Sequence, residues 1–137
     1  MSTVLRTELS RKNKYFISKH RRLELVHFCL QYDEWDKALK MVKYYPSTDL
    51  DKVTPSNREV SDITAENAVR LEELKRNMRI VKDTCFETDI EICDWIFLGV
   101  TKGYSFTKLK TAYNLPCEKE MYYDRLKKFF YLLDKKR

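Results

Sequence analysis

The sequence of 137 residues contains very little glycine and proline. Only two glycines and three prolines occur, which excludes collagen-like and low-complexity sequences and argues against a turn-rich all-β fold. No run of about 18 apolar residues is present, so we expect neither a transmembrane helix nor a membrane partner. Segment 1–14 mixes charged residues without an apolar core, so we expect no signal peptide there.

The sequence also lacks the motifs of common metal and catalytic sites. Its four cysteines are spaced 56, 8 and 24 residues apart and form no C-x-x-C pair. We find no glycine-rich phosphate loop, no G-x-S-x-G elbow and no H-E-x-x-H helix. Widely spaced cysteines among apolar residues are typical of a reduced core. We therefore expect a cytoplasmic, non-enzymatic protein without a metal or other cofactor.

Aromatic residues and charge are abundant. Nine Tyr, seven Phe and two Trp are too many for a disordered chain. Residues 1–24 carry 7 basic and 2 acidic side chains, residues 25–100 carry 10 and 15, and residues 101–137 carry 10 and 4. Both ends are therefore basic and the middle is acidic. This asymmetry suggests that the ends face a polyanion, although Lys and Arg also serve simply to solvate helix surfaces.

Apolar spacing predicts an all-α fold of about six helices in one compact domain. We expect residues 1–14 to form a flexible basic arm, residues 15–137 to form the single helical domain, and residues near 46–62 to form a polar loop. The expected N-caps are Ser18, Asp33, Thr64 or Asp62, Thr88 or Asp89, and Ser105. Gly103 and Asn114 should end helices, since both tolerate the left-handed conformation.

Two of the predicted helices have a distinctive apolar pattern. In the third helix the steps alternate between three and four residues, which gives a narrow seam made of Leu71, Leu74, Met78, Val81 and Cys85. This seam could pack within the domain or against a second copy. Residues 88–102 are the most apolar segment and should form a central, buried helix. A homodimer through the helices of residues 65–100 is therefore one expected assembly.

The order of elements in residues 88–137 predicts a helix-turn-helix-like unit. Leu109 and Tyr113 should face the core from the first helix, Leu115 should fill the turn, and Met121 or Tyr122 should anchor the second helix. Lys110 departs from the pattern, because a small residue normally stands there. The turn also looks slightly longer than the usual three or four residues.

The final helix carries the candidate nucleic-acid contacts. Lys119 and Tyr123, with Glu120, lie near its start, where side chains of such a unit meet base edges. Further along, basic residues would contact phosphates, which gives affinity without sequence information. The candidate binding residues are Lys119, Tyr123, Arg125, Lys127, Lys128, Lys135, Lys136 and Arg137. A solvated basic face remains the alternative interpretation.

Several short segments carry a family resemblance. Residues 29–35 (CLQYDEW), 100–106 (VTKGYSF), 115–117 (LPC), 122–125 (YYDR) and 128–133 (KFFYLL) resemble small uncharacterised proteins of phages and mobile elements in Gram-positive bacteria. The C-terminal third is distantly similar to phage late-gene transcription regulators of the ArpU type and to region 4 of sigma factors. The resemblance implies a DNA-binding regulator by analogy.

Three functional hypotheses follow. The first is a non-enzymatic transcription regulator that binds double-stranded DNA through the C-terminal basic helix. The second is a helical protein-interaction module, such as a phage-encoded inhibitor of a host nucleic-acid enzyme or a packaging accessory, with a host or phage protein as partner. The third is a small metal-dependent nuclease using acidic residues such as Glu91 and Asp94, although helix capping also accounts for these carboxylates.

Overall fold

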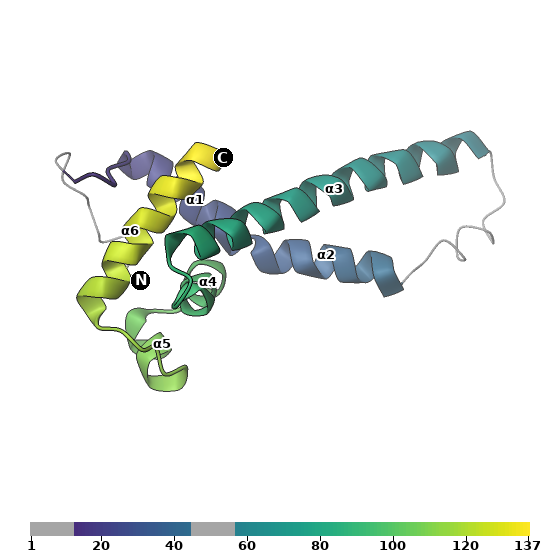
Figure 1. Ribbon diagram of the computed structural model, residues 1–137. Coiled ribbons are helices and arrows are strands. Elements are labelled where there is room, and N and C mark those ends of the chain that lie inside the picture. Colours follow the sequence, from purple (N-terminus) through teal and green to yellow (C-terminus); the bar gives the residue numbers. More distant parts are fainter. Residues whose placement is uncertain (1–12, 45–56) are drawn as a thin grey trace.

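Six α-helices make up the described part of the chain, and the predicted all-α class is confirmed. The computed structural model describes residues 13–44 and 57–137, and the side chains of residues 13–41 and 67–137 (Figure 1). The helices are α1 (Lys19–Leu30), α2 (Tyr32–Tyr44), α3 (Asn57–Thr88), α4 (Cys93–Lys102), α5 (Phe106–Ala112) and α6 (Lys119–Lys136). No helix in the described ranges is long and apolar enough to cross a membrane.

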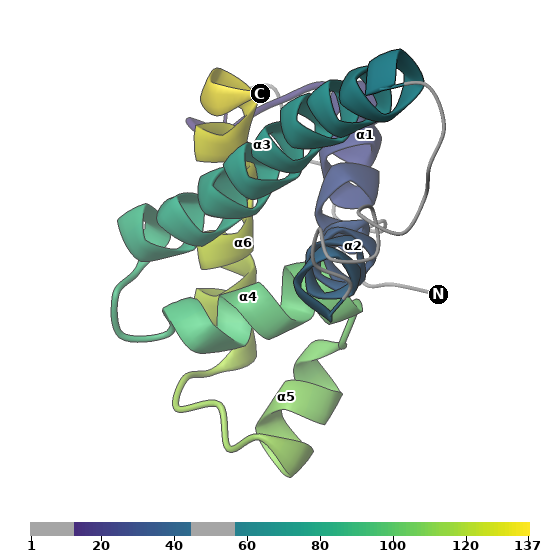
Figure 2. The same cartoon turned by 90° about the vertical axis from the view of Figure 1, so that its right-hand side faces the viewer.

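The longest helix, α3, organises the arrangement. Its C-terminal half packs against α6 and α4, and α2 lies beside it. Figure 1 shows α2 and α3 projecting together away from the other helices, whereas α5 and the start of α6 lie at the other end of the molecule. Viewed from the side, α3 crosses in front of α6 (Figure 2). Helix α6 thus packs against α3 over part of its length, while its first turn lies beyond α3.

Local sequence signals account for several helix ends. Ser18 accepts a hydrogen bond from the backbone amide of Arg21, and Ser105 accepts one from that of Lys108 at 3.2 Å, as predicted for N-caps. Gly103 ends α4 with φ of 72°, and Asn114 follows α5 with φ of 55°. Both left-handed positions were predicted from residue type, because glycine lacks Cβ and asparagine tolerates this region.

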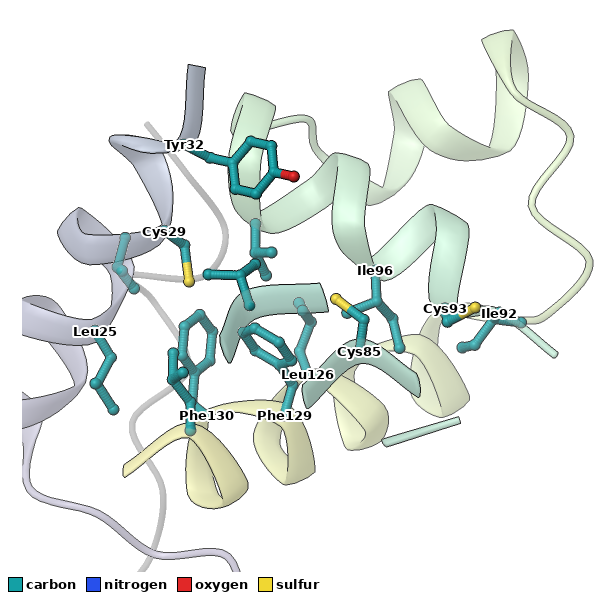
Figure 3. Packing of buried hydrophobic residues seen from close by; sticks show 14 of the residues in the cluster. Leu25, Cys29, Tyr32, Cys85, Ile92, Cys93, Ile96, Leu126, Phe129 and Phe130 are labelled. Carbon is teal, nitrogen blue, oxygen red and sulfur yellow. The ribbon is translucent and has the colours of Figure 1, made fainter. Parts of the chain in front are cut away.

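The core lies between α1, α3, α4 and α6. Helical spacing places Tyr122, Leu126, Phe129 and Leu133 on one face of α6, and all four are at most 1% exposed. Phe130 is equally buried, which widens this apolar face. Figure 3 shows Cys29, Cys85 and Cys93 among core residues that include Leu126, Phe129 and Phe130. All four cysteines are unpaired and buried, namely Cys29, Cys85, Cys93 and Cys117.

The predicted helix over residues 88–102 begins later than expected. Thr88 is the last residue of α3, where its hydroxyl donates to the carbonyl of Thr84 at 2.7 Å. Residues 89–92 form a turn, and the N-cap of α4 is Ile92 without a side-chain bond. Asp89 accepts the amide of Glu91 at 2.9 Å within that turn. Its oxygen therefore organises the connection and does not occupy the helix N-cap.

Two other helix starts differ from prediction. The third helix begins at Asn57, so residues 57–62 of the expected loop are helical and neither Asp62 nor Thr64 is its cap. This part contains neither glycine nor proline, so nothing interrupts the helix although few apolar residues mark it. Asp33 lies in the first turn of α2, since Gln31 alone separates α1 from α2.

The predicted arm and loop lie mainly outside the described residues, because the structure describes neither residues 1–12 nor residues 45–56. The seam of α3 packs within this chain over its C-terminal part. Val81 and Cys85 are buried, while Leu74 and Met78 are half-buried against the same core.

Candidate nucleic-acid interface

Helices α5 and α6 and the connection between them are the elements for which the sequence predicts a helix-turn-helix-like unit. Its turn is closed by the backbone, since the amide of Leu115 donates to the carbonyl of Leu109 at 3.1 Å. Leu109 is 0% and Leu115 2% exposed, so one faces the core and the other fills the turn as predicted. Residues 113–118 separate the two helices, which is longer than the usual three or four residues.

Lys110 uses the extra length of this turn. Its ammonium donates to the carbonyl of Cys117 at 3.2 Å and lies 3.8 Å from the carboxylate of Glu118. The long side chain therefore spans the gap between α5 and the N-terminus of α6. A small residue is needed at this position when the two helices of the unit touch closely. Here the turn is longer, so it accommodates a lysine whose contacts stabilise it.

Tyr113 does not face the core, contrary to prediction. It is 39% exposed, and its ring stacks on that of Tyr104 at 5.5 Å with an interplanar angle of 19°. Helix α5 ends at Ala112, and Tyr113 at its C-cap leaves the helical path with φ of −121°. The ammonium of Lys108 lies 3.9 Å from the Tyr104 ring centre. The sequence did not indicate this aromatic pair with its lysine, because Tyr113 was expected to face the core from the helix.

Tyr122 is the anchor of α6. It is 1% exposed, whereas Met121 is 38% exposed. Burial raises the pKa of the Tyr122 hydroxyl, as expected for a group whose charged form would lose its hydration. Its ring lies 5.9 Å from that of Phe106 on α5. Because Tyr122 is fixed, Lys119 and Glu120 are left exposed at the start of the helix, with Tyr123 half-buried beside them.

Arg125 is committed to interactions within the fold. Its Nε donates to Asp89 at 2.9 Å, and its Nη1 donates to Asp124 at the same distance. Burial alone would raise the pKa of Asp89, but hydrogen bonds from Arg125 and from two backbone amides hold that pKa below its usual value. The pair ties α6 to the turn between α3 and α4. Arg125 is therefore a poor candidate for a phosphate contact.

The other candidate residues divide into two groups. Lys136 donates to Glu87 at 2.7 Å, and the guanidinium of Arg137 lies 4.4 Å from the centre of the Phe28 ring. In contrast, Lys119, Lys127 and Lys128 have no ion-pair partner within the described part of the chain. Lys135 lies 4.3 Å from the centre of the Tyr131 ring. Four lysines and Tyr123 thus remain available on α6.

The residues considered for metal chemistry are not gathered into a site. Glu91 and Asp94 are both exposed, near the start of α4. Across the described residues, no group of three or more His, Cys, Asp or Glu side chains is placed to hold a metal ion. Burial raises the pKa of the Cys85 thiol to about 12, and this thiol therefore stays protonated and poorly nucleophilic at neutral pH.

Comparisons with protein-family models, with curated proteins and with solved structures find no match to this chain.

Proposed function

We propose that this chain is a non-enzymatic, double-stranded DNA-binding protein that contacts the major groove with the N-terminal half of α6. The observation that carries the proposal is the closed turn between α5 and α6, in which Leu115 and Tyr122 are buried while Lys119 and Glu120 are exposed. A helix presented in this way is the element that helix-turn-helix proteins insert into DNA. The family resemblance supports a transcription regulator of phage or mobile-element origin.

The available lysines supply the electrostatic part of such binding. Lys119 lies at the exposed start of α6, and Lys127 and Lys128 follow two turns later. Positive charges without internal partners can each neutralise a phosphate and release its counterion. Arg125 cannot contact a phosphate without breaking its ion pair with Asp89, which holds α6 in place. The proposed contacts are therefore Lys119, Tyr123, Lys127, Lys128 and Lys135.

A charge-reversal experiment tests this proposal. The variant Lys119→Glu/Lys128→Glu should weaken binding of a short duplex at least about tenfold, since two phosphate contacts become repulsive. The control Lys37→Glu/Lys40→Glu makes the same charge change at exposed positions on α2, and should bind like the wild type. Equal loss in both pairs would show that only net charge matters, which contradicts a defined binding face.

A second copy would complete the regulator, because two half-sites give the affinity that one unit seldom reaches. Phe86 is 58% and Ile90 73% exposed, and both belong to the region predicted to dimerise. Phe86 lines a groove of about 300 Å³ between α3 and α4, together with Lys82, Cys85, Cys93, Asp94 and Phe97, and Ile90 lies in the turn that joins these two helices. An Ile90→Asp variant should then sediment as a monomer where the wild type sediments as a dimer.

The same two apolar side chains favour the alternative function, a module that binds another protein. Large exposed apolar groups mark interaction sites as readily as they mark self-association. A wild-type protein that is monomeric and does not bind duplex DNA even at low salt would favour this alternative. A DNA-binding protein whose dimer is lost in Ile90→Asp would argue against it.

A further inference from the structure

A patch of tyrosine and lysine covers the outer side of α6 in its second half. Tyr15, from the segment before α1, packs on Tyr131 with ring centres 5.6 Å apart. We call this the tyrosine–lysine patch, and it consists of Lys14, Tyr15, Lys127, Lys128, Tyr131 and Lys135. Neither Tyr15 nor Tyr131 was among the candidate binding residues.

A short turn places the first two residues of the patch. The side chain of Asn13 accepts the amide of Tyr15 at 2.8 Å, and its carbonyl accepts the amide of Phe16 at 3.0 Å. Ile17, the next residue but one, packs against the core. The turn therefore fixes Tyr15 against α6 even though it precedes the first helix.

The lysines surround the tyrosine pair. The ammonium of Lys14 lies 5.0 Å from the Tyr15 ring centre, and that of Lys135 lies 4.3 Å from the Tyr131 ring centre. Lys127 and Lys128 stand four and three residues before Tyr131, and thus one helical turn away on the same side. A cation over a ring keeps its other N–H groups for a further partner.

Carboxylates on this side of α6 are paired with arginines. Asp134 is bound by Arg21 at 2.6 Å, and Asp124 is bound by Arg125 at 2.9 Å. Each arginine also binds a second carboxylate, Arg21 that of Glu24 and Arg125 that of Asp89. Within the described residues the four lysines of the patch have no ion-pair partner, so they carry the positive charge of this surface.

The length of α6 separates the patch from the N-terminal end of the helix, which is proposed to enter the major groove. Lys119 and Lys135 are 16 residues apart, which corresponds to about 24 Å along a helix. A major groove about 12 Å wide admits a single helix. The second half of α6 is flanked by α1, α3 and the segment before α1, so this half is too wide to enter the groove.

We infer that the tyrosine–lysine patch binds the phosphate backbone of duplex DNA beside the groove that the start of α6 enters. This inference rests on the proposed function. A lysine ammonium group lies over each ring, and the two rings pack against each other. Such a surface suits phosphate oxygens better than the stacked bases of a single strand.

The test measures the salt dependence of duplex binding. In the variant Lys14→Gln/Lys135→Gln, the slope of log affinity against log salt should become shallower by about 2, since each lost phosphate contact removes about 0.9. The control Lys37→Gln/Lys40→Gln removes the same charge from exposed positions on α2 and should keep the wild-type slope. The variant Lys14→Arg/Lys135→Arg retains both charges and should restore it.

The outcomes separate this inference from the proposed function. If the wild type binds duplex DNA and Lys14→Gln/Lys135→Gln keeps the wild-type slope, the patch is not a phosphate contact and the inference is wrong. If the wild type does not bind, the proposed function itself fails. The thermal unfolding of Lys14→Gln/Lys135→Gln should match that of the wild type, and a loss of slope accompanied by loss of the folded state would also overturn the inference.

Discussion

The close approach of α4 and α6 gives a sharp test of how the α5–α6 unit is positioned. Gly99 on α4 is buried, and a Cβ added there would collide with the hydroxyl of Tyr122. The next ring atom of Tyr122 would lie 3.5 Å away and a methyl of Leu109 3.6 Å away, both ordinary contacts. The hydroxyl oxygen alone therefore makes glycine necessary at this position.

Two opposing effects set the expected magnitude for Gly99→Ala. Forcing an extra methyl group into a packed core costs about 1–3 kcal/mol, while replacing glycine by alanine within a helix gains about 1 kcal/mol. We expect Gly99→Ala to be net destabilising by about 1 kcal/mol, which is roughly 4 °C in melting temperature for a chain of this size. In a Tyr122→Phe background the collision disappears, and the same substitution should be neutral or stabilising.

The assay is a double-mutant cycle of the free energy of unfolding, measured by denaturant titration of the wild type, both single variants and the double variant. We expect a favourable coupling of about 2 kcal/mol between the two sites. Additive effects would refute the reasoning, because they would mean that the Tyr122 hydroxyl does not lie against Gly99. Since Tyr122 anchors α6, Gly99→Ala should also weaken DNA binding, and Tyr122→Phe should restore it.

Two further predictions concern the turns that hold the unit. Asp89→Asn should cost about 2 kcal/mol at pH 7, since it weakens a charge-assisted bond to Arg125. Because the pKa of Asp89 in the folded state lies below its ordinary value, the stabilisation is present above about pH 4 and is lost as the pH falls through the folded pKa. Urea titrations over this range should show the stabilities of the wild type and Asp89→Asn converging as the pH falls. A difference that stays constant with pH would contradict the pairing. Asn114→Ala should lower stability by about 1 kcal/mol and Asn114→Gly by less, since φ of Asn114 is 55° and a residue with a Cβ is strained there. Equal thermal stability of all three would contradict a strained position.

Much of the α5–α6 unit could be predicted because its signals are local. Ser105 and Asn114 act through their own backbone neighbourhood, and the apolar stripe of α6 follows from helical spacing alone. The start of α3 at Asn57 could not be predicted in this way. Its first turns lack apolar periodicity, and the absence of glycine and proline permits a helix without requiring one.

The sequence could not predict which basic residues form ion pairs within the fold and which do not, for a different reason. Arg125 and Lys136 look like Lys127 and Lys128 in a list of charges, but their partners are Asp89 and Glu87, 36 and 49 residues away. Only the packing of α6 against the end of α3 and the turn after it determines which cations form ion pairs within the fold. Likewise, the contact between Tyr15 and Tyr131 joins segments that are distant in the sequence, and no periodic pattern predicts it.

The salt dependence of duplex binding tests the central claim most directly, namely that the lysines of α6 contact DNA. Fluorescence anisotropy with a labelled duplex of roughly two helical turns, between about 50 and 200 mM salt, measures it. The account predicts binding at low salt and a log–log slope of about −3 or steeper, since Lys119, Lys127 and Lys128 alone offer three phosphate contacts. No binding at the lowest salt, or an affinity that does not change with salt, would contradict it.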